Sequence, residues 1–264
     1  MSQKHFKNIR EIIYQSCGIN LKRGKEALVR ARLMKRLRAT GISSVTEYLN
    51  YLESSQGANE LGLLIDVMTT NKTSFFREAE HFNYLRDQVL PELNGRRLRF
   101  WCAACSSGEE PFTLGIWLRE HLADIDSRDV LILATDISKQ MLEKARRAVY
   151  PAETMGNLPS SYYQKYFIKL NGQRLGSYRV VDNVRKMVRL AGLNLLESWP
   201  MKGPFNVIFC RNVMIYFDRQ TQQALINRFW EMLEPGGHLF VGHSEGLSGI
   251  KHKFRYMGPA TYRK

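Results

Sequence analysis

The first seventy residues place apolar side chains at the three- and four-residue spacing of amphipathic helices. No run in this part alternates with the period of two that marks a half-buried strand. Glycine or serine stands beside most of the breaks, where such residues end or begin helices. The predicted helices span 5–17, 24–40, 45–52 and 61–68. Residues 1–70 are therefore predicted to form an all-α N-terminal domain.

Beyond residue 96, short apolar runs alternate with amphipathic segments. This alternation predicts a parallel sheet with helices on both faces, and the ligand of such a sheet lies beyond the carboxyl ends of its strands. The predicted strands span 98–105, 130–135, 205–210 and 238–242, and the predicted helices span 111–122, 139–149 and 221–233. Residues 96–264 are therefore predicted to form an α/β domain.

The pattern changes between residues 162 and 190. Three short apolar runs are separated there by the turn pairs Asn171-Gly172 and Asp182-Asn183. The runs span 166–170, 178–181 and 184–190. They predict a small antiparallel β insert on the α/β domain.

The chain is basic, with 39 Lys and Arg against 25 Asp and Glu and a net charge of +14. A positive surface attracts nucleic acid, anionic membrane or an acidic protein, and charge alone does not choose between them. No apolar run follows the basic N-terminus, and no apolar stretch reaches about 18 residues. Four cysteines are too few for a disulfide scaffold. We expect a cytoplasmic protein that does not insert into a membrane.

Two turns carry candidate chemistry. Ser106-Ser107-Gly108 joins the first strand to a helix, and such a turn lets the backbone approach a ligand. Asp136 ends the second strand, 28 residues after Gly108. Its carboxylate can accept hydrogen bonds from a ribose or can cap the next helix, and the spacing favours neither.

A Pro235-Gly236-Gly237 turn between a helix and a late strand predicts the reverse hairpin that closes many methyltransferase sheets. Together with Asp136, it indicates a class I S-adenosylmethionine (SAM) fold.

The chain resembles the chemotaxis receptor methyltransferase family, CheR, over nearly its whole length. Five segments carry the resemblance: TTNKTSFFRE at 69–78, SSGEEP at 106–111, NLL at 194–196, FCRNVMIYFD at 209–218 and GHSE at 242–245. The resemblance implies a Rossmann-like core with a β insert, preceded by the helical domain. Residues 71–95 would form a linker helix region that covers the cofactor site.

The family's activity is transfer of a methyl group from SAM to receptor glutamates, which leaves S-adenosylhomocysteine. By resemblance, Arg211, Tyr216 and Arg77 would position the substrate glutamate. The implied cofactor-binding residues are Asn71, Thr73, Arg77, Glu110, Asp136, Asn194, Leu195, Arg211 and Asn212.

This chemistry fits the residue types. A glutamate with a pKa near 4.3 is ionised at neutral pH, so its carboxylate needs no general base. An arginine and a tyrosine can hold one carboxylate oxygen while the other attacks. We expect no metal site, because Cys102-x-x-Cys105 is predicted to pack within a strand without a second ligand pair. The predicted surface histidines are His5, His81, His121 and His252.

The helix over 24–40 places Lys25, Arg32 and Arg36 on one face. That face is either a solvated surface or a docking site for the acidic helical cytoplasmic region of a methyl-accepting chemotaxis receptor. The resemblance favours docking, by a monomer recruited to membrane receptor clusters. A related signalling pathway outside motility stays an alternative.

Two rival functions fit parts of the sequence. A nucleic-acid methyltransferase would suit the charge, but the strand end reads Cys210-Arg211-Asn212-Val213 instead of the Asn/Asp-Pro-Pro-aromatic tetrapeptide of amino-group methylating enzymes. A non-catalytic SAM-binding scaffold would not need Arg77 and Tyr216. We expect no nucleic-acid partner.

Overall fold

The computed structural model describes residues 2–22, 24–93, 95, 97–156, 158–172 and 175–264. The predicted insert loop after Gly172 lies partly outside these residues, at positions 173–174. The N-terminal part forms the four helices that the spacing predicts: α1 (Gln3–Cys17), α2 (Glu26–Thr40), α3 (Val45–Glu53) and α4 (Ala58–Met68). Gly18 and Gly41 end the first two helices in the left-handed conformation, which glycine adopts without strain.

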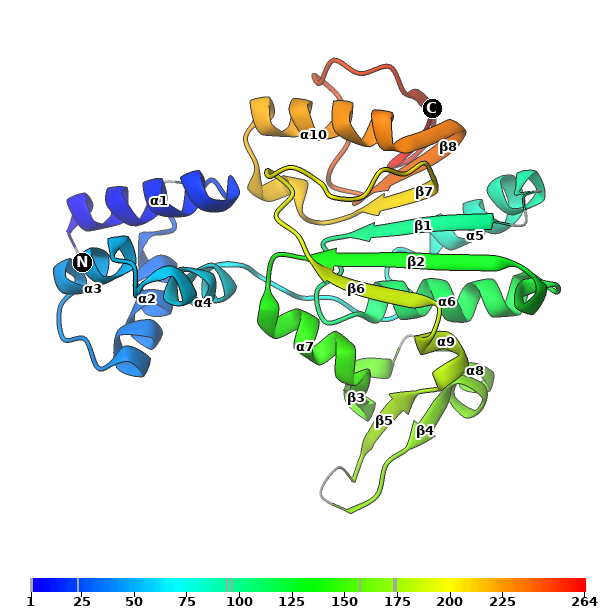
Figure 1. Ribbon diagram of the computed structural model, residues 1–264, viewed down its shortest axis with the longest axis horizontal. Helices are drawn as coiled ribbons and strands as arrows, with labels where there is room; N and C mark the ends of the chain where they lie inside the picture. The colour runs from blue at the N-terminus through cyan, green and yellow to red at the C-terminus, as the bar shows by residue number, and fades with distance from the viewer. Residues whose placement is uncertain (1, 23, 94, 96, 157, 173–174) are drawn as a thin grey trace.

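The linker region is only partly regular. It holds α5 (Ala79–Tyr84), a short π-helix (Leu85–Val89) and a 3₁₀ turn (Leu90–Glu92). Phe82 and Leu85 of this region are buried against one face of the sheet. The segment before α5 runs across the carboxyl ends of the strands and joins the helical part to the sheet (Figure 1).

The sheet has seven strands among the described residues, in the order β6-β2-β1-β7-β8-β10-β9. The first five are parallel, and β10 is antiparallel to both β8 and β9. The strands are β1 (Arg97–Ala103), β2 (Asp129–Asp136), β6 (Val188–Gly192), β7 (Phe205–Cys210), β8 (Leu233–Val241), β9 (Arg255–Gly258) and β10 (Thr261–Arg263). The expected α/β domain with helices on both faces is confirmed.

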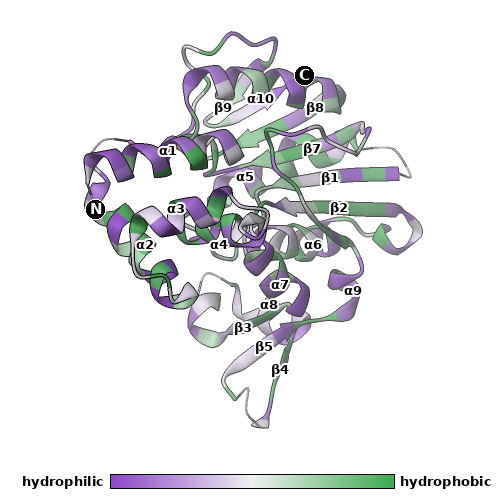
Figure 2. Cartoon of the chain, turned by 60° about the vertical axis from the view of Figure 1, so that its left-hand side comes forward, coloured by the Kyte–Doolittle hydropathy of each residue, from purple (hydrophilic) through white to green (hydrophobic). Residues whose placement is uncertain are grey.

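Residues of β1 alternate between two hydrophobic cores. Trp101 packs on the face covered by α10 (Arg219–Met232), whereas Cys102 packs on the face of α5 and α6 (Glu109–His121). A further helix, α7 (Lys139–Arg147), follows β2. Figure 2 shows hydrophobic residues concentrated on the central strands, including β2 and β7. This packing leaves the carboxyl ends of β1, β2 and β7 free to form a site.

The β insert is real, but its predicted strands were partly wrong. It consists of β3 (Val149–Pro151), β5 (Ser177–Val180) and β4 (Phe167–Lys169), in that order. Two short helices flank it, α8 (Ser160–Tyr166) and α9 (Asp182–Arg185). The run 184–190, assigned to the insert, instead contributes β6, which pairs in parallel with β2 at the edge of the main sheet. Asp182-Asn183 is therefore the start of a helix and not a hairpin turn.

The Pro235-Gly236-Gly237 prediction also needs correction. These residues lie inside β8, which begins directly after α10 and pairs in parallel with β7 through a register shift. The antiparallel hairpin that closes the sheet is β9–β10, which the sequence reasoning missed.

The helical part packs directly on the α/β part. Apolar residues of α1 to α4 belong to the same core cluster as those of α10 and β7. The Tyr14 hydroxyl donates to Asp218 at 2.5 Å, and the Asn20 amide donates to the Tyr216 carbonyl at 2.8 Å. The predicted domain limits at 70 and 95 stay predictions, since one core crosses the first of them. Each helix in the described part of the chain is too short or too polar to cross a bilayer.

Candidate functional site

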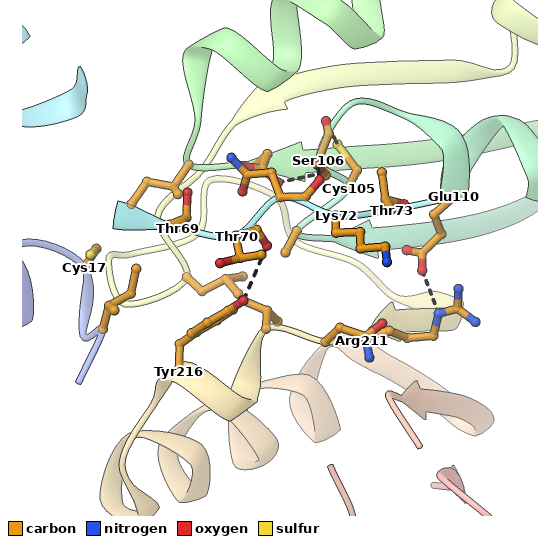
Figure 3. Close-up of a pocket in the computed structure, with 18 of the residues that line it drawn as sticks. Cys17, Thr69, Thr70, Lys72, Thr73, Cys105, Ser106, Glu110, Arg211 and Tyr216 are labelled. Atoms are coloured by element: carbon orange, nitrogen blue, oxygen red, sulfur yellow. Dashed lines mark hydrogen bonds and ion pairs between the residues drawn. The ribbon is translucent and has the colours of Figure 1, made fainter. Parts of the chain in front are cut away.

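A pocket lies at the carboxyl ends of β1, β2 and β7, under the segment 69–77 (Figure 3). All ten predicted cofactor and substrate residues line it. They are Asn71, Thr73, Arg77, Glu110, Asp136, Asn194, Leu195, Arg211, Asn212 and Tyr216. The structure thus brings these side chains together, while the role of each one stays a prediction.

The turn after β1 is held in an unusual conformation. Ala104 and Ser106 have positive φ values of 72° and 50°, and Gly108 has 98°. The amides of Ala104 and Cys105 both donate to the Thr135 carbonyl at 2.8 Å. Left-handed residues other than glycine cost free energy and gather at functional sites. Here they wrap the backbone around the pocket floor.

Asp136 is buried at the end of β2. Its Oδ2 accepts from the Ser106 amide at 2.7 Å, and its Oδ1 accepts from the Ser138 amide at 2.8 Å. Burial raises the pKa of this carboxyl above its usual value, although the amide bonds oppose the rise. Ser138, and not Asp136, caps α7. Each Asp136 oxygen keeps a lone pair for a ligand hydroxyl, because a carboxylate oxygen accepts two hydrogen bonds.

Arg211 is 6% exposed and already has partners within the protein. Its Nε donates to Glu110 Oε2 at 2.7 Å, and its Nη1 donates to the Arg77 carbonyl at 2.8 Å (Figure 3). Glu78 Oε2 lies 3.6 Å from the same Nη1. Its charge is therefore balanced by two carboxylates, and Nη2, which bonds to no residue that the structure describes, remains for a ligand.

His81 was predicted on the surface and is instead 1% exposed. It packs beside Phe240 at the sheet, and its Nδ1 lies 3.2 Å from Arg211 Nη1, which donates to it. Burial and the Arg211 charge lower the pKa of His81 to about 3. The ring is therefore neutral and supports Arg211 from below the pocket.

Glu78, His81 and His243 place one possible metal-ligand atom each within 4.8 Å of one another. Arg211 Nη1 already faces two of them, at 3.6 Å from Glu78 Oε2 and 3.2 Å from His81 Nδ1. The positive charge of Arg211 would repel a metal ion bound there, so we assign no metal.

Arg77 and Tyr216 enclose the pocket from the segment above it and the loop below it. Arg77 Nη1 donates to the Lys72 carbonyl at 2.9 Å, and the Tyr216 hydroxyl donates to the Thr70 carbonyl at 3.3 Å. Both side chains are only partly buried. They are placed to contact a group that enters the pocket from solvent.

Glu245 organises the loop that carries the site, and sequence reasoning did not single it out within GHSE. Its buried carboxylate accepts from the amides of Asn212 at 2.6 Å, Gly242 at 2.7 Å and Ile215 at 3.1 Å. Asn212 has a φ of 60°, so the loop depends on these bonds to keep a strained conformation. A Cβ on Gly242 would lie 2.6 Å from Glu245 Oε2, which explains the glycine.

The pocket cysteines are not reactive thiols. Burial raises the pKa of Cys17 to about 11, and burial also raises that of Cys105. Cys102 lies within β1, whereas Cys105 lies in the turn after it and not in the predicted strand. Both are buried and unbridged.

The exposure expected for the face of α2 that holds Lys25, Arg32 and Arg36 is wrong for the two arginines, while their docking role stays a prediction. Arg36 donates from Nε and Nη2 to the two oxygens of Glu60 at 2.8 Å each, and Glu60 is 5% exposed. Arg32 donates to the Met68 carbonyl at 2.5 Å and to Thr70. These arginines join α2 to α4 and the linker, so only Lys25 of the three is fully exposed. Helical spacing showed that the three residues share one face of α2, but it could not show that α4 packs beside that face.

The outer side of α2 is different. A surface groove on this side is lined by Ala27, Ala31 and Met34, by the acid Glu26 and by three cations. These cations are Arg30, Lys35 and Arg38, and all three are exposed.

Comparison with known proteins matches both parts of the chain to one family. Residues 4–69 match the family description "CheR methyltransferase, all-alpha domain", and residues 71–263 match "CheR methyltransferase, SAM binding domain". The chain is 41% identical to the "Chemotaxis protein methyltransferase" of Borreliella burgdorferi, over 96% of this chain and 92% of that protein. It is also 41% identical to the "Chemotaxis protein methyltransferase" of Escherichia coli K12, over 99% of this chain and 91% of that protein.

Proposed function

Because the chain belongs to the CheR methyltransferase family, we propose that it transfers the methyl group of SAM to glutamate side chains of a chemoreceptor. The products are glutamate methyl esters and S-adenosylhomocysteine. The family and the relatives already make the chain a SAM-dependent methyltransferase of chemotaxis. The glutamate substrate and the roles of single residues belong to the proposal.

One observation supports a carboxylate substrate. The residues that line the pocket include two arginines, a lysine and a tyrosine, and among these described lining residues there is no histidine. The two cysteines there are held as thiols. The two carboxylates that line it, Glu110 and Asp136, already accept hydrogen bonds within the protein and are assigned to cofactor binding. The pocket therefore offers charge and hydrogen bonds, and its described lining holds no histidine or thiolate base. A glutamate, ionised at neutral pH, is the nucleophile that can react without one.

The pocket's donors and acceptors fit SAM. Asp136 would accept from the ribose hydroxyls, Glu110 would face the ammonium, and Arg77 would pair with the methionine carboxylate. Asn194 and Leu195 would flank the adenine. When bound, SAM supplies a methyl carbon on a positively charged sulfur, and the residues of this chain supply alignment.

Tyr216 would hold one oxygen of the substrate carboxylate, leaving the other in line with the methyl carbon, and Arg77, paired with the methionine carboxylate, would lie beside it. Arg211 would contribute its remaining Nη2, while Glu110 and Glu78 keep its charge partly balanced. This balance suits the reaction, because the substrate loses its negative charge as the ester forms.

The receptor would dock on the outer groove of α2. Two alanines allow a partner helix to approach closely, and Arg30, Lys35 and Arg38 would pair with its acidic residues. Docking by a monomer at this groove would recruit the enzyme to receptor clusters.

The docking proposal has a matched test. Arg30→Glu with Arg38→Glu should reduce receptor methylation severalfold at subsaturating receptor and low salt, because attraction becomes repulsion. Lys186→Glu with Arg189→Glu makes the same charge change at exposed positions near the amino edge of the sheet. If both double variants lose receptor methylation equally, general electrostatic attraction explains the effect and docking at the α2 groove is contradicted.

The function itself is tested by incubating the protein with methyl-labelled SAM and, separately, with chemoreceptor, RNA and DNA. We expect label on the receptor alone. Label on nucleic acid would favour the rival methyltransferase, and SAM binding without any transfer would favour a scaffold.

A further inference from the structure

In the described part of the chain, three cations line the pocket, Lys72, Arg77 and Arg211, and they differ in the hydrogen bonds and ion pairs that they already make within the protein. Arg211 is neutralised by Glu110 at 2.7 Å and Glu78 at 3.6 Å. Arg77 is fixed by the Lys72 carbonyl, with Glu78 at 4.0 Å from its Nε. Lys72 makes no side-chain hydrogen bond or ion pair with any residue that the structure describes. Its ammonium is thus the pocket cation with the most unbalanced charge.

Lys72 lies on the segment that covers the pocket, between Asn71 and Thr73. Its side chain is exposed, and Figure 3 shows it extending toward the space between Glu110 and Arg211. Its backbone is fixed by the Arg77 bond to its carbonyl and by the neighbouring bond from Ser106 Oγ to the Asn71 carbonyl. A flexible, exposed side chain on a fixed backbone therefore places a cation at the pocket.

Two carboxylates must be held there at once, if the proposed function is right. One belongs to the methionine part of the cofactor and the other to the substrate glutamate. Since the charge of Arg211 is already balanced and its Nη2 offers only hydrogen bonds, Arg77 and Lys72 are the cations left for them. We propose that Lys72 binds the carboxylate of the incoming glutamate, as a specificity residue that the family resemblance did not assign.

A lysine suits this task for a physical reason. Its ammonium is a compact charge on a flexible stem, and it does not need the bidentate geometry of an arginine. The ammonium can attract a carboxylate from solvent, while the Tyr216 hydroxyl aligns the reacting oxygen. Because the ion pair between Lys72 and the glutamate is partly exposed, it contributes little free energy. Breaking it therefore costs little when the ester forms and the product leaves.

The test measures binding, separately from methyl transfer. The probes are two helical receptor peptides, one with glutamate and one with glutamine at the methylated positions. Calorimetry records their binding to the protein saturated with S-adenosylhomocysteine. Lys72→Gln should weaken the glutamate peptide about fivefold, the scale of a half-exposed ion pair. It should leave the glutamine peptide and the affinity for S-adenosylhomocysteine unchanged.

Lys72→Arg should restore most of the preference for glutamate, whereas Lys186→Gln, the same charge change at an exposed distant lysine, should have no effect. Equal weakening of both peptides, loss of affinity for S-adenosylhomocysteine, or no preference for glutamate in the wild type would each overturn the proposal. A wild type that binds the glutamate peptide through Lys72 but methylates no receptor would instead contradict the proposed function.

Discussion

Replacing Arg36 by alanine separates a structural arginine from a docking one. The guanidinium makes two bonds of 2.8 Å to Glu60, which also accepts from the Tyr48 hydroxyl at 2.6 Å. Glu60 is 5% exposed, and the Arg36 side chain is 16% exposed. Arg36→Ala would leave a buried carboxylate with one neutral partner.

Removing one partner of a buried ion pair costs about 3–5 kcal/mol of unfolding free energy, and the small exposure of Arg36 favours the lower end. A loss of about 3 kcal/mol corresponds to a fall in Tm of roughly 6–12 °C for a chain of this size. Arg38→Ala, on the exposed side of the same helix, should change the unfolding free energy by less than about 0.5 kcal/mol.

Thermal and denaturant unfolding measure both variants. Arg36→Ala with Glu60→Gln should recover part of the loss, because the unpaired charge is gone. Burial acts to raise the pKa of Glu60, but the Arg36 and Tyr48 hydrogen bonds outweigh it and the net pKa is lowered. The pair's stabilisation is therefore complete above the unfolded pKa of Glu60, near 4.3, and is lost as pH falls through the folded value. An Arg36→Ala protein as stable as Arg38→Ala would refute the reasoning.

Three further changes test the site. Asp136→Ala should weaken SAM binding by about 1.5–3 kcal/mol in calorimetry, and unchanged affinity in a folded variant would contradict the ribose assignment. Tyr216→Phe should lower the turnover rate with little change in SAM affinity, and the wild-type rate at saturation should show no rising limb near pH 6–7; a histidine-like limb would contradict a reaction without a base. Glu245→Gln leaves an amide group facing backbone donors, so it should lower the unfolding free energy by about 1–3 kcal/mol and reduce turnover more than SAM binding. Wild-type turnover in that variant would show that the loop does not need Glu245.

The sequence predicted those helices and strands in which the apolar pattern continues over enough residues to be recognised. The four N-terminal helices and the strands β1, β2 and β7 are of this kind, because each shows a continuous apolar pattern. The strand β6 was assigned to the wrong sheet, since its pairing of Ile132 with Val188 joins residues far apart in the chain. The hairpin β9–β10 was missed because its strands have only four and three residues.

The site followed from motifs, whereas its electrostatics did not. The motifs contain nine of the ten predicted residues, Asp136 was named from its place at a strand end, and all ten line the pocket. The motifs gave no sign that Arg211 is balanced by Glu78 and Glu110. His81 was placed on the surface because a six-residue helix has too few turns to show a buried face. Arg36 was expected to be exposed because its partner Glu60 lies on another helix, and helical spacing within α2 carries no information about that contact.

The chemical nature of the methylated group tests the central claim most directly. Receptor treated with this protein and SAM would be digested and mapped by mass spectrometry, before and after mild base. The account predicts methyl groups on glutamate side chains that mild base removes as methanol, because a carboxyl ester is hydrolysed where a methylated amine is not. Methyl groups that survive base, or that lie on lysine or another amine, would contradict it.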